Sequence, residues 1–437
     1  MKHPEKILSP VGIIRGGAEL PHLKGTAELE SIIMPPPAKV NIALKQHIGV
    51  PCEPIVNVGD KVFVGTKIAD SENNFSAPIH SSVSGTVSAI TGEFITIESD
   101  GQMELDPSIT PPTIETADDL VKAARDCGLV GLGGAGFPVH IKLAPATSDA
   151  IDTLIINGAE CEPYITSDYR TCMEDFDYII GGVYLLKEIF NFKKIIIAIE
   201  GNKPKAIEKL YEIATDKQDV EDTVKLMRLN TSYPQGAEKM LVYATTKRKI
   251  PMGKLPADVG CVVMNITTIA TLYKYIKTGI PLVSKRITFE GNAAIEPKNV
   301  IVPIGTPIAD VIEFCGGVND DAEKILYGGT MMGIAVKDDF SPILKQNNAI
   351  LVMAPENHVK STPCIRCGRC ANACPMNLAP ARIENCLNTQ NEAALPSLNV
   401  NYCMECGSCS FVCPARRPLT QSMRTAKSIL RRNNNAK

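Results

Sequence analysis

Tryptophan is absent from this 437-residue sequence, and aromatic residues make up only 5% of it. Proteins that bind bases or sugars by stacking need aromatic platforms, so the composition disfavours that class. The formal net charge is −3, which gives no sign of nucleic acid as a partner. Histidine is scarce, with 6 residues, and this disfavours hydrolases built on Ser–His or Cys–His pairs.

Long apolar runs are also missing: none approaches the ~18 residues that a membrane-spanning helix needs. Residues 1–17 contain no compact apolar core followed by a small-residue cleavage site, so we predict no signal peptide. We therefore expect a reducing compartment and no disulfide framework. In that setting the 15 cysteines indicate metal or redox chemistry.

Eight of the cysteines form two copies of the pattern C-x2-C-x2-C-x3-C-P. In this pattern three thiolates hold one [4Fe–4S] cluster, and the fourth cysteine ligates the other cluster. The predicted ligands of one cluster are Cys364, Cys367, Cys370 and Cys413. The predicted ligands of the second are Cys403, Cys406, Cys409 and Cys374.

A pair of zinc ribbons is the alternative interpretation of these cysteines. Zinc ribbons use two C-x2-C knuckles per metal, which explains neither a third equally spaced cysteine nor the C-P ending. Cys386 lies between the two runs without a fitting spacing, and we interpret it as a small buried hydrophobe. The scattered cysteines are predicted to be inert: Cys52, Cys127, Cys172, Cys261 and Cys315.

The N-terminal part of the chain divides into two predicted units. Residues 1–34 are irregular and form an N-terminal extension. Residues 35–105 contain short alternating strands broken by glycine turns, which is typical of a small all-β unit. This unit resembles the barrel-sandwich domain of biotinyl and lipoyl carriers. Its predicted hairpin tip at 80–82 has no lysine to carry a group, so we expect a docking or structural role.

The middle of the chain, residues 115–281, is predicted to be an α/β layer domain. Residues 117–126 and 205–214 have helical spacing, whereas 152–157 and 193–200 have the apolar runs of buried parallel strands.

Two further units follow. Residues 283–340 return to short strands around a predicted helix at 307–314, which looks like a β-grasp module. The cluster domain covers 358–420, and a basic tail occupies 421–437. We interpret this tail either as a solvated terminus or as a contact with a partner or an anionic membrane surface.

A glycine-rich loop follows the first predicted helix of the α/β domain. Gly131, Gly133 and Gly136 match G-x-G-x-x-G, but a Rossmann fingerprint follows a strand, whereas here a helix comes first and Pro138 closes the loop. Glycines still let backbone N–H groups approach a phosphate or a flat ring. Phe137 is placed to stack on an aromatic ligand. A plain surface loop is the alternative.

A second polar segment, residues 157–163 (NGAECEP), comes directly after a predicted buried strand. Ligands of α/β sheets bind at that position. Glu160 and Glu162 are therefore candidates for binding ribose hydroxyls or ring nitrogens. A metal site is disfavoured because no histidine is near.

These segments carry a family resemblance. Residues 131–138 (GLGGAGFP), Lys142 and residues 157–163 resemble the FMN- and NADH-binding motifs of the flavoprotein subunit of respiratory complex I. Residues 233–238 and 265–268 resemble the next two flavin-site segments of that family. The order of units, from about residue 12 to 425, resembles the C subunit of the Rnf electron transport complex.

The resemblance implies a multidomain α/β fold. It comprises an α/β flavin-binding core, an N-terminal barrel-sandwich β domain, a β-grasp module and a C-terminal two-cluster ferredoxin-like helical domain. The implied cofactors are FMN and two [4Fe–4S] clusters, with NADH as substrate. The implied catalytic residues are Glu160 and Glu162. The implied cofactor-binding residues are Gly131, Gly133, Gly134, Phe137, Lys142, Asn157, Glu160, Glu162, Tyr233, Gly236, Glu238, Asn265 and Thr268.

Within this set, Phe137 is implied to stack on the NADH adenine, and Glu162 and Glu238 to hold nicotinamide-side or ribose groups. Lys142 is implied to meet the flavin or its phosphate. The sequence departs from the complex I motif where Ala159 and Ala237 replace acids and where no arginine accompanies the glycines.

The implied function is electron input. Such a protein exchanges electrons between NAD(H) and ferredoxin, coupled to Na⁺ or H⁺ transport, and sits peripherally on the cytoplasmic face of the membrane with the other Rnf subunits. Three alternatives stay open. They are a soluble reductase like the cobalamin reductase of propanediol metabolism, a proline-reductase-associated carrier, and a non-enzymatic ferredoxin-like adaptor.

Overall fold

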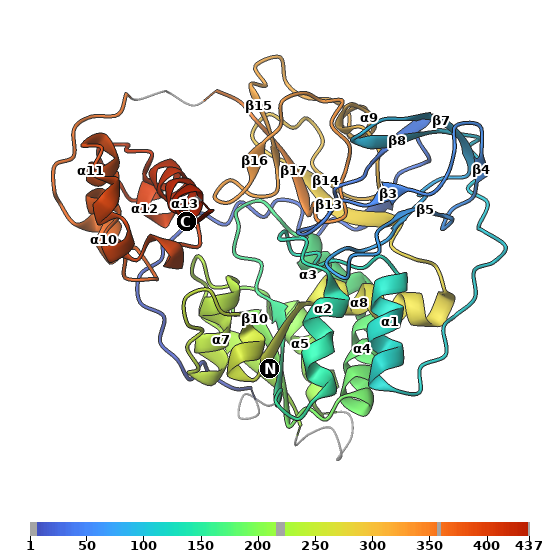
Figure 1. The fold of residues 1–437 in the computed structure, drawn as a ribbon, viewed down its shortest axis with the longest axis horizontal. Coiled ribbons are helices and arrows are strands. Elements are labelled where there is room, and N and C mark those ends of the chain that lie inside the picture. Colours follow the sequence, from blue (N-terminus) through green and yellow to red (C-terminus); the bar gives the residue numbers. More distant parts are fainter. Residues whose placement is uncertain (1–6, 216–222, 356–359, 436–437) are drawn as a thin grey trace.

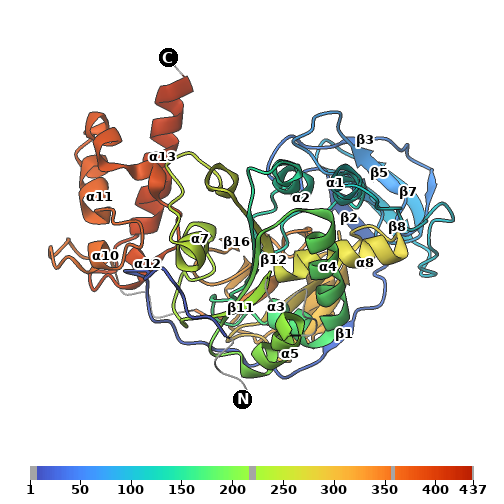
Figure 2. The same cartoon turned by 90° about the horizontal axis from the view of Figure 1, so that it is seen from below.

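The computed structural model describes residues 7–215, 223–355 and 360–435. The ends of the predicted extension and tail, and the first two residues of the predicted cluster domain, lie outside these ranges. The helical C-terminal module and the N-terminal β unit lie at opposite ends of the molecule, with the α/β core between them (Figure 1). The view from below shows the same separation (Figure 2).

A four-stranded parallel sheet forms the centre of the α/β core, in the order β11-β10-β9-β12. The strands are β9 (Thr153–Gly158), β10 (Lys194–Glu200), β11 (Val224–Leu229) and β12 (Cys261–Asn265). Their nearly continuous apolar runs are buried because helices cover both faces of such a sheet. The strand order reverses between β9 and β12, since β10 and β11 extend the sheet on one side of β9 and β12 joins the other.

The helices of the core pack on this sheet through apolar faces. They are α1 (Ala117–Asp126), α2 (Val139–Leu143), α3 (Ser167–Glu174), α4 (Phe176–Ile189), α5 (Pro204–Thr215), α7 (Glu238–Thr246) and α8 (Ile266–Thr278). Helix α1 has the predicted bounds, and its start is set by a capping box between Thr116 and Asp119. The five 3-10 helices of the described residues are Ala144–Thr147, Pro256–Val259, Glu392–Ala394, Pro396–Leu398 and Val400–Tyr402.

The N-terminal β unit has two antiparallel sheets, ordered β2-β8-β7-β4 and β3-β5-β6. Its strands are β2 (Lys39–Ala43), β3 (Glu53–Pro54), β4 (Lys61–Val62), β5 (Lys67–Asp70), β6 (Ile79–His80), β7 (Gly85–Ile90) and β8 (Phe94–Ser99). Alternating residues such as Val40, Ile42, Ile95 and Ile97 fill a separate apolar core between the sheets.

A six-stranded mixed sheet, ordered β1-β14-β13-β17-β15-β16, packs with α9 (Ile308–Phe314). Its strands are β1 (Ser31–Ile33), β13 (Ser284–Glu290), β14 (Lys298–Pro303), β15 (Lys324–Tyr327), β16 (Ile334–Ala335) and β17 (Ala349–Met353). Strand β1 pairs in parallel with β14, whereas the sequence predicts irregular chain there. The sheet thus reaches beyond the predicted range 283–340 on both sides.

The C-terminal module consists of short helices around its own small core. The helices are α10 (Arg369–Asn372), α11 (Pro380–Asn388), α12 (Ser408–Phe411) and α13 (Leu419–Asn435). Most of the predicted basic tail is part of α13, because Met423, Ala426 and Leu430 form an apolar stripe that packs on this core. None of the helices described has both the length and the apolar composition needed to cross a membrane.

Candidate functional site

The candidate site lies where the strand order of the core sheet reverses. Asn157 and Asn265 are paired at the carboxyl ends of the adjacent strands β9 and β12. Ligands of open α/β sheets bind at such a point. The predicted site segments 157–163 and 265–268 therefore meet at one edge of the sheet.

The glycine loop lies beside the end of β12. Leu132 N–H donates to Thr268 Oγ1 at 3.0 Å, which fastens the loop to the first turn of α8. A Cβ at Gly133 would stand 3.0 Å from Asn265 Nδ2, so only glycine fits without displacing that amide. A side chain at position 133 would therefore push the glycine loop away from the start of α8.

The loop closes on itself and leaves an open face. Gly131 N–H donates to Phe137 O at 2.8 Å, and Gly136 N–H donates to Gly131 O at 3.2 Å. Gly134 has a φ of +120°, and a Cβ there would have no heavy atom within 4 Å. The backbone therefore faces free space at Gly134, as contact with a phosphate or a flat ring requires. These residues fit an FMN cradle.

The N-terminal β unit borders this loop. Ile48 N–H donates to Gly136 O at 3.0 Å. The ring of Phe75 meets that of Phe137 edge to face, with 5.3 Å between centroids. Phe137, the residue predicted to stack on a ligand, is thus in contact with the β unit. This arrangement agrees with a docking or structural role for that unit.

Four further predicted residues form two contacts on the other side of the site. Lys142 Nζ lies 2.8 Å from Glu238 Oε1, and both side chains are partly exposed. Asn157 Nδ2 donates to Gly236 O at 2.9 Å. The segments that resemble flavin-site motifs are therefore adjacent although about 80–100 residues separate them.

Asn265 organises the start of α8. Its Oδ1 accepts hydrogen bonds from the N–H groups of Thr267 and Thr268, at 2.9 and 3.2 Å. Its Nδ2 donates to Asp168 Oδ2 at 2.7 Å. The side chain of Asn265 thus caps the 13-residue helix α8 and ties its start to α3. The sequence analysis missed Asp168, for which only its place near the start of a helix was a signal.

Glu160 is buried at the N-terminus of α3. Its carboxylate accepts hydrogen bonds from the N–H groups of Asp168, at 2.7 Å, and Tyr169, at 3.4 Å. Burial raises the pKa of Glu160 to about 7, and the nearby ammonium of Lys24 opposes this shift. The carboxylate is thus positioned by the helix, two residues from Glu162.

Glu162 points elsewhere. Its two carboxylate oxygens accept hydrogen bonds from Met331 N–H and Met332 N–H, each at 3.0 Å, in the β15–β16 connection. Burial raises the pKa of Glu162, and these two amides counteract the shift. The two predicted catalytic residues thus lie on one turn, but their carboxylates bind different elements. Glu160 binds the start of α3, and Glu162 binds the β15–β16 connection.

Tyr233 connects the site to the C-terminal module. It belongs to the segment at 233–238 and is buried, with 3% of its surface exposed. Its hydroxyl donates to the carbonyl oxygen of Cys406 at 2.7 Å. A predicted flavin-site residue therefore touches a predicted cluster ligand.

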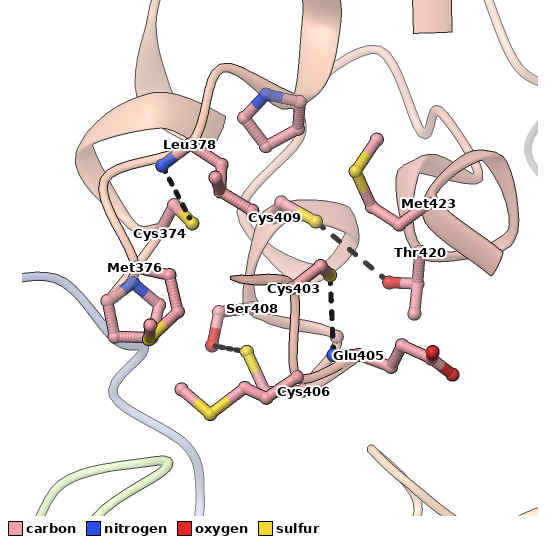
Figure 3. Close-up of a pocket in the computed structure, with 14 residues that line it drawn as sticks. Cys374, Met376, Leu378, Cys403, Glu405, Cys406, Ser408, Cys409, Thr420 and Met423 are labelled. Atoms are coloured by element: carbon pink, nitrogen blue, oxygen red, sulfur yellow. Dashed lines mark hydrogen bonds between the residues drawn. The ribbon is translucent and has the colours of Figure 1, made fainter. Parts of the chain in front are cut away.

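Four of the eight motif cysteines line one pocket, and they are the crossed set Cys374, Cys403, Cys406 and Cys409. Figure 3 shows their side chains around a common space. Leu378 N–H lies 3.3 Å from the sulfur of Cys374, and Glu405 N–H lies 3.3 Å from that of Cys403. Four thiolates with N–H donors are the ligand set of a [4Fe–4S] cluster, so the residues fit this group.

The other set is more open. Cys364 and Cys367 are exposed, and Cys370 and Cys413 are half-buried. Burial raises the pKa of Cys370, and the neighbouring thiols of Cys413 and Cys364 add to this shift. Within the described ranges, no three His, Cys, Asp or Glu side chains are spaced to share a single metal ion.

The remaining cysteines named above take part in the side-chain packing of the fold. Cys386 packs against the apolar core of the C-terminal module, in agreement with its interpretation as a small hydrophobe. The scattered ones are buried, and burial raises the pKa of Cys127 and Cys315 to about 12. Their inertness stays a prediction.

Lys24 is the second residue that the sequence analysis missed. Its Nζ donates to the carbonyl oxygens of Glu160 and Glu162, each at 2.8 Å, and also to that of Ile165. It lies in the extension predicted to be irregular, where the polar run Lys24-Gly25-Thr26 was the available signal.

Three family models match the chain. The Nuo51 FMN-binding domain matches residues 124–274, the RnfC barrel sandwich hybrid domain matches 13–105, and the SLBB domain matches 296–335. The range 124–274 includes the glycine loop and the carboxyl ends of β9 and β12, and the range 13–105 includes the N-terminal β unit.

Curated relatives match over most of the chain. The C subunit of the proton-translocating ferredoxin:NAD(+) oxidoreductase complex of Clostridium ljungdahlii is 43% identical, covering 83% of this chain and 81% of the relative. The C subunit of the Na(+)-translocating ferredoxin:NAD(+) oxidoreductase complex of Acetobacterium woodii is 39% identical, covering 95% and 96%. The C subunit of the ion-translocating oxidoreductase complex of Rhodobacter capsulatus is 37% identical, covering 95% and 83%.

A solved structure shares the fold. A chain of the NAD+-reducing [NiFe]-hydrogenase in its H2-reduced state matches with a TM-score of 0.51 and 18% identity. The match covers 73% of this chain and 62% of that one. At this identity the likeness concerns the arrangement of the elements.

Proposed function

The chain belongs to the family of C subunits of ion-translocating ferredoxin:NAD(+) oxidoreductase complexes, and we propose that it is the NADH-binding electron-input subunit of such a complex. It exchanges electrons between NAD(H) and ferredoxin through FMN and two [4Fe–4S] clusters. The exchange is coupled to Na⁺ or H⁺ transport by the partner subunits. The chain lies peripherally on the cytoplasmic face of the membrane.

The finer assignment of units belongs to the same proposal. The sheet around α9 is a β-grasp module that binds a soluble ligand, which the SLBB match at 296–335 supports. The module from about residue 358 is a two-cluster ferredoxin-like domain, which the pocket of four crossed cysteines supports. The barrel-sandwich unit at 35–105 docks on the glycine loop.

FMN, when bound, takes a hydride from NADH and passes electrons on singly, and a [4Fe–4S] cluster accepts one electron at a time. The glycine loop would hold the flavin against its backbone, and Asn265 and Thr268 at the start of α8 would lie near its phosphate. Lys142 would meet the flavin or its phosphate, and Glu238, which pairs with Lys142, would hold nicotinamide-side or ribose groups of NADH. Glu160 and Glu162 shape the turn between these groups.

The observation that carries the proposal is the hydrogen bond from Tyr233 to the carbonyl of Cys406. It joins a site segment to the ligand loop of one cluster without an intervening element. The set Cys374, Cys403, Cys406 and Cys409 is therefore proximal to the flavin site. The set that contains the exposed Cys364 and Cys367 faces outward, where electrons leave for a partner.

A glycine substitution tests the flavin site. In Gly133→Val the new side chain meets Asn265, so the reconstituted protein should lose acid-releasable FMN and NADH:ferricyanide activity while its cluster absorbance persists. Gly92→Val is the matched control, because a Cβ at exposed Gly92 meets no heavy atom within 4 Å.

Two results would contradict the proposal. Wild-type protein that is loaded with flavin and iron, yet does not oxidise NADH, would refute the function. Flavin retained by Gly133→Val at wild-type affinity would refute the location of the pocket.

A further inference from the structure

The chain segment before the β unit crosses three parts of the molecule. We call residues 16–26 the strap. Gly17 N–H donates to Ala373 O at 2.8 Å, in the C-terminal module next to the cluster ligand Cys374. Ala18 and Tyr233 exchange backbone hydrogen bonds in both directions, at 2.8 and 3.2 Å. The strap therefore passes from the cluster module along the residue that touches Cys406.

The strap next reaches the turn at residues 160–165. This turn follows β9 and has no helix or strand of its own, so its carbonyl groups have no ladder partners. The ammonium of Lys24 donates to three of them, from Glu160, Glu162 and Ile165. Lys203 Nζ also lies 3.5 Å from the Glu160 carbonyl oxygen, and Tyr164 N–H donates to His22 O at 3.1 Å. Among the described residues, Lys24 alone donates to all three carbonyl groups, and charge-assisted bonds are the stronger kind.

The strap also has an anchor that does not involve Lys24. Gly25 N–H and Thr26 Oγ1 donate to the carboxylate of Glu290, at 3.2 and 3.0 Å. The hydroxyls of Thr26 and Thr166 are 2.7 Å apart, and both threonine side chains are fully buried. These contacts do not involve the side chain of Lys24, so a substitution of Lys24 leaves this anchor of the strap in place.

We propose that Lys24 is a positioning residue of the oxidoreductase site, which fixes the turn at 160–165 and thereby the carboxylates of Glu160 and Glu162. This inference rests on the proposed function, because it assigns a purpose to that site. The same strap fixes the turn relative to Tyr233 and Ala373. Lys24 thus fixes the positions of Glu160 and Glu162 relative to the proximal cluster.

The test compares Lys24→Met with Glu290→Gln in the full chain. Hydrogen exchange of the apoprotein, read on the backbone amides of 158–166, reports the turn without any cofactor. Reconstituted protein then gives FMN and iron content, the melting temperature, and KM and kcat for NADH with ferricyanide.

In Lys24→Met we expect exchange at 158–166 to rise about tenfold, since three charge-assisted bonds are lost together. We expect kcat/KM for NADH to fall about tenfold, since the reacting groups are displaced. FMN and iron content should stay near wild type. Glu290→Gln should loosen residues 26–30 and lower the melting temperature, while exchange at 158–165 and the KM change less than in Lys24→Met.

Two outcomes overturn the inference. One is wild-type exchange at 158–166 together with a wild-type KM in Lys24→Met. The other is the same profile in both variants, which would make Lys24 a general staple of the fold. An inactive wild type, by contrast, would refute the proposed function and leave the exchange data to judge Lys24.

If Lys24→Met does not fold, the same measurements on Lys24→Arg test the inference. Arginine keeps the charge but cannot place one nitrogen on three carbonyl groups. Raised exchange at 158–166 at a normal melting temperature would support the inference, and wild-type exchange with a wild-type KM would overturn it.

Discussion

The α/β core and the cluster module are held together by different means. The core buries two apolar clusters, one on each face of its four-stranded sheet, with Leu154 and Ile197 completely inaccessible. The apolar core of the cluster module has seven buried side chains, and the first two cysteines of its first run, Cys364 and Cys367, are exposed. We expect a unit with so small a core to depend on its metal centres for folding. The two ends of one electron path thus differ in what keeps them ordered.

The largest expected effect comes from removing a cluster ligand, which should disorder the cluster module and leave the α/β core folded. In Cys406→Ser we expect residues 360–435 to lose protection from hydrogen exchange and protease, because the proximal cluster and its ordering are lost. The core should keep its FMN and its melting transition. Cys386→Ser is the matched control, since Cys386 is not in either predicted ligand set and should leave the iron content unchanged. A Cys406→Ser module as protected as wild type would show that its apolar core suffices.

A cavity in the α/β core should destabilise the core and leave the cluster module unchanged. Leu154 is fully buried on β9, so Leu154→Ala should cost about 2–5 kcal/mol of unfolding free energy. Denaturant unfolding followed by flavin fluorescence should show the loss, while the absorbance of the clusters changes little before the core unfolds. A simultaneous loss of both signals at lower denaturant would mean that the two regions unfold as one.

Acid should produce a smaller difference, which arises in the N-terminal β unit and not in the cluster module. Burial, with the cation of Lys345 adding to it, lowers the pKa of His80 to about 3. Below an unfolded pKa of about 6.5 the unfolded chain binds a proton that the folded chain does not, so stability falls as pH falls, by about 1.4 kcal/mol per pH unit.

His80→Gln cannot titrate, so its stability between pH 6.5 and 5 should fall less steeply than that of wild type. The measurement is the denaturant midpoint of the flavin-free protein at each pH. The cluster module has no histidine in the described residues 360–435, and it should not contribute to this slope. Equal slopes for the two proteins would contradict the burial of a neutral His80.

The local features of both regions could be predicted from the sequence. The crossed cysteine set follows from the spacing within two short runs, and the pocket formed by Cys374 with Cys403, Cys406 and Cys409 agrees with it. Helix α1 has the predicted bounds because its capping box and apolar stripe are contiguous in the chain. Each of these signals lies within about a dozen residues of the chain.

Contacts across long separations could not be predicted in this way. Lys24 binds carbonyl groups more than 130 residues away, and Asp168 binds Asn265 across 97 residues. Backbone carbonyl acceptors carry no side-chain signature, so no local pattern marks the partner of Lys24. The direction of the Glu162 carboxylate, toward Met331 and Met332, was hidden for the same reason. The roles implied for individual FMN and NADH contacts stay predictions.

The strap has a consequence for biosynthesis. Residues 7–33 are synthesised before the elements that they contact: Leu8 pairs beside β11, Lys24 binds the turn at 160–165, and β1 pairs with β14. The contact of Gly17 requires residue 373, close to the end of the chain. Since domains fold as they are synthesised, the core sheet forms while these early residues are still unplaced. The segment at residues 7–33 is thus secured only after the elements that it contacts have been synthesised.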